Sequence, residues 1–191
     1  RGDLTDPSTI IASGPSDGGE WPTSGVTFAW TGADNLTLAD QLQFAYRLDG
    51  GVFTPFDGTR QRTFTGLTEG PHVFEVKARD RAGREDGSPA IVHFAVAFLD
   101  LIPTAGSTPD SGFFDQGLAL EFAVKNQGAG SAAGSWADSV FLSADDQLGN
   151  DEPLQSIPHA GGLTSGGTYE STADISIPFH VGQMYWLVLK V

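Results

Sequence analysis

The 191-residue chain contains no cysteine, which excludes disulfide bonds, a thiolate nucleophile and cysteine-ligated metal sites. Basic residues are scarce, because 10 Lys and Arg stand against 24 Asp and Glu, a net charge of −14. This balance argues against a nucleic-acid partner, since phosphate binding depends on Lys and Arg. No apolar run reaches the roughly 20 residues of a membrane-spanning helix, so membrane insertion is not expected.

The chain shows a clear alternation of apolar and polar residues. Side chains that are apolar except for His72 and Asp138 recur at every second position over 26–30, 42–48 and 72–78, and again over 118–124, 136–142 and 173–177. A period of two predicts β-strands with one face buried. Glycine-rich breaks such as Asp49-Gly50-Gly51, which predicts a hairpin, separate these stretches. Many short strands with turns at this spacing predict an all-β protein built as sandwiches or barrels.

The charge distribution divides the chain near residue 97. Residues 1–97 hold 8 basic and 13 acidic residues, a net of −5, whereas residues 98–191 hold 2 and 11, a net of −9. Each half has the length of an immunoglobulin-like sandwich. We therefore predict two tandem immunoglobulin-like domains, 1–97 and 98–191. The short apolar link 97–101 predicts a fairly stiff rod.

The first half carries a recognisable pattern. Residues 46–56 read YRLDGGVFTPF, residues 65–80 read TGLTEGPHVFEVKARD, and the turn RAGRED follows at 81–86. Over about residues 6–97 this is similar to the immunoglobulin/fibronectin type III-like repeat of bacterial surface proteins. Arg84 stands where that family usually has an Asn, so any side-chain cap from the Asn is lost. The resemblance implies an immunoglobulin-like sandwich.

The second half carries a different recognisable sequence pattern. It reads DL at 100–101, FAVKNQG at 122–128 and GSWADSVFLSAD at 134–145. Over about residues 98–191 it resembles CARDB, the cell adhesion related domain found in bacteria. The resemblance implies a seven-stranded sandwich whose last strand would follow Val191. We therefore expect the second domain to lack its last strand and to leave an open sheet edge, which is a template for pairing with another chain.

One acidic loop is the strongest candidate for a metal site. Calcium takes six to eight oxygen ligands, and clustered Asp, Asn and Glu supply them. The spacing does not match the EF-hand pattern, so a solvated hairpin loop remains the alternative. The candidate ligands are the loop residues together with one strand residue: Asp138, Asp145, Asp146, Asn150, Asp151 and Glu152. For Asp138 a hydrogen bond to a turn is an equal alternative.

A second acidic turn contains Asp80, Glu85 and Asp86. Arg79, Arg81 and Arg84 flank it, so internal salt bridges are a simpler account there than a metal. No cofactor is required in this interpretation, and calcium is the one that the sequence leaves open.

Catalysis is not expected. Residues 14–18 match the letters of the G-x-S-x-G nucleophile elbow, but no helix is predicted after them. The four histidines share no metal-binding or catalytic spacing. We therefore assign no catalytic residue. Trp21, just before Pro22, is a candidate sugar-stacking aromatic, with a plug over the end of the sandwich as the alternative.

The sequence thus predicts a non-catalytic structural or adhesive segment of a larger secreted or cell-surface bacterial protein. It would act as a spacer or docking module between neighbouring domains, with another protein or a surface polysaccharide as a further partner. Two alternatives to the spacer remain open. One is a calcium- or carbohydrate-binding accessory module of a secreted enzyme, and the other is a fibre subunit completed by strand exchange.

Overall fold

The computed structural model describes residues 3–107, 117–178 and 185–191. It divides into two compact units, Arg1–Phe98 and Leu99–Val191, one residue after the predicted boundary. The described residues are strands and loops apart from one short 3-10 turn, Ala39–Gln41. The predicted all-β class is therefore confirmed. Within the described ranges, no helical segment has the length and apolar character that crossing a membrane requires.

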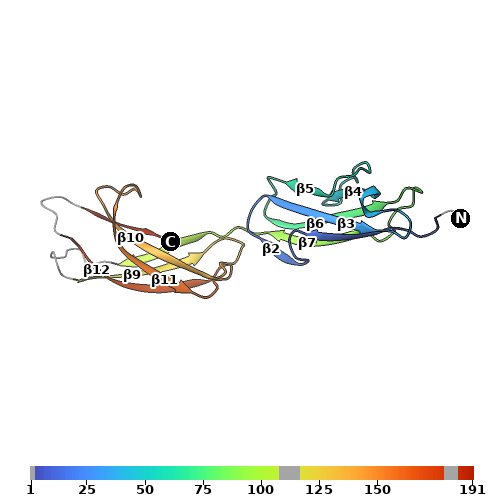
Figure 1. Cartoon of the computed structure of the whole chain (residues 1–191). Coiled ribbons are helices and arrows are strands. Elements are labelled where there is room, and N and C mark those ends of the chain that lie inside the picture. Colours follow the sequence, from blue (N-terminus) through green and yellow to red (C-terminus); the bar gives the residue numbers. More distant parts are fainter. Residues whose placement is uncertain (1–2, 108–116, 179–184) are drawn as a thin grey trace. The chain divides into compact units, whose positions relative to one another are not determined.

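Unit 1 is a sandwich of two sheets (Figure 1). All of its strand pairs are antiparallel except β2 with β7, which is parallel. One sheet has the order β1-β3-β5, with β1 (Ser8–Ser13), β3 (Val26–Ala33) and β5 (Gln61–Phe64). The other has the order β2-β7-β6-β4, with β2 (Gly19–Trp21), β7 (Ala90–Val96), β6 (Gly70–Arg79) and β4 (Gln43–Leu48).

The core of unit 1 consists of the inward residues that the alternation predicts. Burial along β3 alternates, and Val26, Phe28 and Trp30 are all buried. The Phe28 ring stacks on Phe74 of β6 with 4.0 Å between centroids, so this pair joins the two sheets. The Trp30 indole donates its Nε1–H to the Thr59 carbonyl at 3.0 Å, which satisfies the polar atom of a buried aromatic.

The predicted turn at residues 49–51 forms, but the second arm of its hairpin does not. Asp49 and Gly50 both have positive φ, 51° and 68°, the combination that a type I′ turn needs. The Gly51 amide donates to the Leu48 carbonyl at 3.0 Å. The chain then returns beside β4 through Thr54, whose amide donates to the Tyr46 carbonyl, without becoming a regular strand. The strand that pairs fully with β4 is β6.

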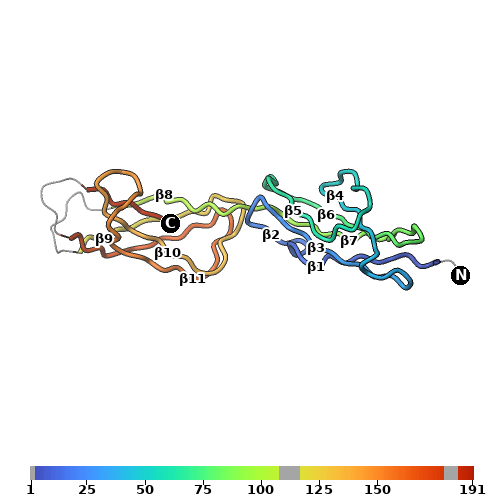
Figure 2. Tube along the Cα trace, turned by 45° about the horizontal axis from the view of Figure 1, so that its top comes forward, coloured from blue at the N-terminus to red at the C-terminus, as the bar shows by residue number. Residues whose placement is uncertain are grey.

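Unit 2 is a second sandwich, and all of its strand pairs are antiparallel. Its strands can be followed in Figures 1 and 2. One sheet has the order β12-β9-β8, with β12 (Thr168–Ser176), β9 (Gly117–Asn126) and β8 (Leu101–Ser107). The other has the order β11-β10-β13, with β11 (Glu152–Ala160), β10 (Ser135–Ser143) and β13 (Trp186–Lys190).

The core of unit 2 is separate from that of unit 1 and smaller. Its fully buried residues include Val124 of β9, Val140 of β10 and Ile175 of β12. Six strands lie within the described part of this unit, against the seven that the CARDB resemblance implies. That a last strand is missing stays a prediction.

The junction between the units is short. The Phe98 amide donates to Glu69 Oε1 at 2.9 Å, and the Phe98 side chain packs against the core of unit 1. Asp100 belongs to unit 2, because its carbonyl accepts the Gln127 amide at 2.8 Å and its Oδ2 accepts Gln127 Nε2 at 2.6 Å. Leu99 is therefore the single residue between two anchored neighbours.

Candidate functional site

The acidic loop predicted to bind calcium connects β10 to β11. Its carboxylates fold back onto the loop's own groups. Asp145 Oδ1 accepts the Gln147 amide at 2.9 Å, and Asp151 Oδ2 accepts the Gly149 amide at 2.7 Å. The Gly149 amide, helped by the Ser143 side chain, holds the pKa of Asp151 below its ordinary value. Asp146 Oδ1 accepts the side-chain amide of Gln147 at 3.0 Å.

These carboxylates do not converge on one point. Across the described ranges, the loop residues form no group of three whose ligand atoms lie within 4.8 Å of one another. Asn150 is exposed in the loop, and Glu152 is already the first residue of β11, opposite Leu142 of β10. Calcium binding by this loop stays a prediction, and it would require the loop to rearrange.

Asp138 is not part of that loop. It lies in the middle of β10, is 0% exposed, and accepts hydrogen bonds from two neighbouring strands. His159 Nε2 of β11 lies 2.6 Å from Asp138 Oδ2, and the Tyr169 hydroxyl of β12 lies 2.8 and 2.9 Å from its two oxygens. The structure therefore places Asp138 in an internal network, and its carboxylate is already occupied.

Aromatic rings surround this network. The His159 and Tyr169 rings lie 4.3 Å apart between centroids, and Trp136 Nε1 donates to the Tyr169 hydroxyl at 3.3 Å. Burial, together with the Asp138 carboxylate, raises the pKa of Tyr169 to about 12. The phenol therefore stays protonated at neutral pH and donates to Asp138. The network joins β10 and β11 of one sheet to β12 of the other.

The segment around Ser16, which matches the letters of the G-x-S-x-G motif, does not form a nucleophile elbow. Residues 14–18 lie in the connection between β1 and β2, and no helix follows them. Asp17 Oδ1 accepts the His93 amide at 2.8 Å, so this aspartate fastens the connection to β7. That amide and the His93 side chain hold the pKa of Asp17 below its ordinary value. The strand–turn–helix context that exposes a catalytic serine is absent here.

Trp21 lies at the edge of the core of unit 1. It belongs to β2, its ring packs against the core, and its Nε1–H donates to the Gly25 carbonyl at 2.8 Å. Half-buried and hydrogen-bonded, it covers the core rather than presenting a free ring. The more exposed tryptophan is Trp186 of β13, at 51%.

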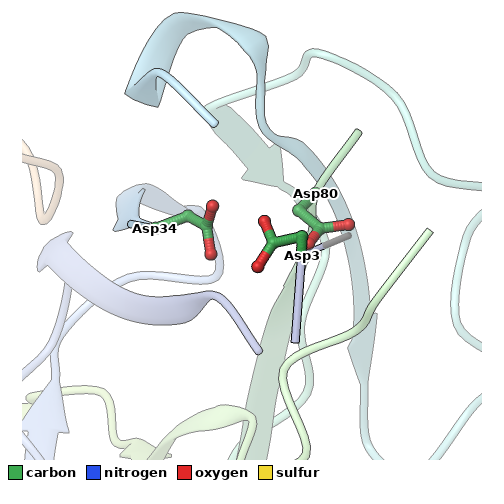
Figure 3. Close-up of side chains that lie close together, drawn as sticks. All are labelled: Asp3, Asp34 and Asp80. Atoms are coloured by element: carbon green, nitrogen blue, oxygen red, sulfur yellow. The ribbon is translucent and has the colours of Figure 1, made fainter. Parts of the chain in front are cut away.

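An unpredicted acidic cluster lies in unit 1 (Figure 3). Asp3 precedes β1, Asp34 follows β3 and Asp80 follows β6, yet one ligand oxygen from each lies within 4.8 Å of the others. The acidic residues of the second turn, Asp80, Glu85 and Asp86, do not gather at one point and have separate partners. Glu85 pairs with Lys77, and Asp86 accepts the Thr9 hydroxyl at 2.7 Å. Sequence spacing gave no signal for Asp3 and Asp34, because the three segments meet only in the folded unit.

Neither a family model nor a curated protein sequence matches the chain. The following solved structures have a similar fold at low sequence identity. A carbohydrate-binding module of the β-sandwich superfamily is 12% identical with a TM-score of 0.39, covering 96% of this chain and 89% of its own. Three N-terminal domains of the bacteriophage RB49 outer capsid protein Hoc are 15% identical, with a TM-score of 0.47. That match covers 97% of this chain and 62% of the Hoc segment.

A two-domain fibronectin type III segment from chicken tenascin is 10% identical with a TM-score of 0.28, and the match covers 97% of this chain and 99% of the segment. At such identities and scores, these likenesses carry no conclusion about activity or ligand. The CARDB resemblance of the second half stays a prediction.

Proposed function

We propose that this chain is a non-catalytic structural or adhesive segment of a larger secreted or cell-surface bacterial protein, in which it spaces or docks neighbouring modules. The observation that carries the proposal is the junction. Phe98 is bonded to unit 1 and Asp100 to unit 2, which leaves Leu99 alone between them. A link of one residue lacks the length that lets flexible linkers sample many orientations.

The ionisable side chains that could take part in catalysis form hydrogen bonds within the sandwiches, which supports a role without catalysis. Asp138, His159 and Tyr169 bond to one another and join two sheets. His72 of β6 is held between Asp49 Oδ2 and the Thr68 carbonyl, each at 2.8 Å. In both units these ionisable groups thus hold strands together.

The spacer role can be tested by measuring distances between the units. The chain has no native cysteine, so Gln61→Cys of β5 and Thr172→Cys of β12, both exposed, give two unique spin-label sites. We expect a narrow distance distribution by pulsed electron paramagnetic resonance. A control with a flexible Gly/Ser insertion after Leu99 should broaden it. A native distribution as broad as that of the control would contradict the spacer role.

A second candidate is a carbohydrate-binding accessory module, and the exposed Trp186 ring favours it. Aromatic rings with one exposed face bind apolar faces of ligands readily. Affinity electrophoresis in gels containing polysaccharide would test this. Retardation that Trp186→Ala abolishes and Trp21→Ala preserves would support binding at β13. Assembly by strand exchange is tested separately by sedimentation, since a strictly monomeric chain contradicts it.

A further inference from the structure

We propose that Asp3, Asp34 and Asp80 of unit 1 form a calcium site. This inference is independent of the spacer function, because it concerns contacts inside one unit. The three carboxylates come from three different segments and gather at one place (Figure 3). Three clustered carboxylates alone do not make a metal site, and the contacts of each oxygen atom decide whether a cation is needed.

Each carboxylate has one oxygen fixed by a backbone amide. Asp34 Oδ2 accepts the amides of Leu36 and Thr37 at 2.9 and 2.7 Å. Asp80 Oδ1 accepts the Arg84 amide at 2.7 Å, and Asp3 Oδ1 accepts the Thr5 amide at 3.1 Å. The fixed oxygens orient the carboxylates before any ligand arrives.

The second oxygens of two of these residues are buried, and no described residue donates to them. These oxygens are Asp34 Oδ1 and Asp80 Oδ2, both shielded from solvent, and the whole Asp80 residue is only 4% exposed. A buried acceptor without a donor is costly, and a buried anion without a cation is costlier. Three carboxylates within 4.8 Å also repel one another. A bound cation removes both penalties.

The neighbouring arginines do not supply that cation. Arg79 donates to Gln43 at 2.8 Å and Arg81 to Gln41 at 3.2 Å, so both are engaged with amide side chains. Arg84 pairs through Nη2 with Asp6 at 2.6 Å, and no described residue accepts from its buried Nε. Of the internal salt bridges that the sequence favoured for the turn of Asp80, Glu85 and Asp86, the described residues form Lys77–Glu85, and none of the three arginines pairs with Asp80.

The chemistry of the cluster selects calcium. All the ligand atoms are oxygens, which favours hard cations over zinc. Calcium–oxygen bonds of about 2.4 Å span up to about 4.8 Å between two ligands of one ion. The three oxygens lie within 4.8 Å of one another, so one calcium ion can contact all of them. Magnesium demands near-ideal octahedral geometry and keeps its waters, whereas calcium accepts the irregular arrangement that carboxylates from three separate segments provide. Water completes the coordination.

Calcium bound here would fasten the segment before β1 to the loops that follow β3 and β6. We expect calcium to raise the unfolding temperature of unit 1 in the intact chain, relative to EDTA, by about 5–10 °C at roughly tenfold excess over Kd. Isothermal titration with calcium chloride should give one site in the micromolar to millimolar range, as is typical of oxygen-ligand sites.

The variants are chosen to separate this site from the acidic loop of unit 2. Asp34→Asn, Asp80→Asn and Asp3→Asn should each weaken calcium binding at least tenfold. In EDTA they should not lower the unfolding temperature, because they relieve repulsion. The matched control is Asp57→Asn, an exposed aspartate whose Oδ1 also accepts a backbone amide, that of Thr59 at 2.8 Å. It should bind calcium like the unaltered chain.

A triple variant of the loop, in which Asp145, Asp146 and Asp151 each become Asn, should also keep the affinity. Loss of binding in that variant, with binding retained in Asp3→Asn and Asp34→Asn, would move the site to the loop and overturn the proposal. No heat of binding and no stabilisation at calcium of about 10 mM would overturn it as well. An equal stabilisation by magnesium would overturn the assignment to calcium. Should Asp80→Asn fail to fold, Asp3→Asn decides, because Asp3 lies outside the strands.

Discussion

The Tyr169 hydroxyl lies 2.8 Å from Asp138 Oδ1 and so joins the two sheets of unit 2 across their packed faces. Asp138 is completely buried, and its second donor is His159. A carboxylate in such a place is tolerated only when hydrogen bonds replace the water it has lost. The Asp138 network is therefore a structural element of this sandwich.

Removing one of the two hydrogen-bond donors to Asp138 should lower the stability of unit 2. Tyr169→Phe keeps the ring and deletes the hydroxyl, so Asp138 loses a hydrogen bond that water cannot easily replace. We expect the free energy of unfolding of unit 2 to fall by about 1.5–3 kcal/mol, the range for hydrogen bonds to charged groups. Urea denaturation followed by circular dichroism measures it. Thr172→Val, on the exposed face of the same strand, is the control. Equal small effects of both changes would contradict the role given to the network.

For Asp138, the sequence predicts the strand face but not the hydrogen-bond partners. The alternation over 136–142 correctly placed it on the same strand face as Val140 and Leu142, which are buried. Its partners could not be predicted, because His159 and Tyr169 lie 21 and 31 residues further along the chain. The sequence therefore makes Asp138 a candidate metal ligand, with a hydrogen bond to a turn as the alternative, and neither describes the network that it forms.

His72 gives unit 1 a dependence on pH. Both ring nitrogens face acceptors, Asp49 Oδ2 and the Thr68 carbonyl, so both must carry a hydrogen to satisfy them. Burial opposes the charged form, but the hydrogen bonds to Thr68 and Asp49 outweigh it, and the pKa of His72 rises above its ordinary value of 6.5. A raised histidine pKa stabilises the fold below pH 6.5, and this stabilisation is lost as pH rises through the folded-state pKa.

We therefore expect the unfolding temperature of unit 1 to fall by a few degrees as pH rises from about 6 to about 8. His72→Gln should flatten this slope, because no group then changes charge at that position. His93→Gln is the control, since His93 pairs with Asp17 on the exposed surface. Differential scanning calorimetry across this pH range provides the measurement. A slope that His72→Gln leaves intact would exclude His72 as its origin.

Gly32 of β3 is fixed by a close backbone approach. A Cβ at this position would lie 2.7 Å from the Ser8 carbonyl oxygen of β1 and 3.1 Å from the Leu42 side chain. Gly32→Ala must therefore push β1 away, and we expect a loss of about 1–3 kcal/mol in the free energy of unfolding of unit 1. Gly87→Ala, where a Cβ meets nothing within 4 Å, should be nearly neutral. Urea denaturation of both variants tests the contrast, and equal stabilities would refute it.

The acidic cluster, like the partners of Asp138, depends on contacts between residues far apart in the chain. Local patterns predicted the strands, the turn at Asp49-Gly50 and the position of Trp30 in the core, since each depends on neighbours in the chain. The meeting of Asp3, Asp34 and Asp80 depends instead on the pairing of β1 with β3 and on the end of β6. No spacing rule relates residues that lie that far apart.

Separate cores predict separate unfolding. Phe28 belongs to the core of unit 1 and Phe122 to that of unit 2, and both side chains are buried. Replacing either one by Ala removes a buried ring and should cost about 3–5 kcal/mol in its own unit. Calorimetry should then show two transitions, with Phe28→Ala lowering one and Phe122→Ala the other. If each variant lowered both transitions equally, the two units would unfold as one cooperative body, and the one-residue link at Leu99 would couple their stabilities as well as their spacing.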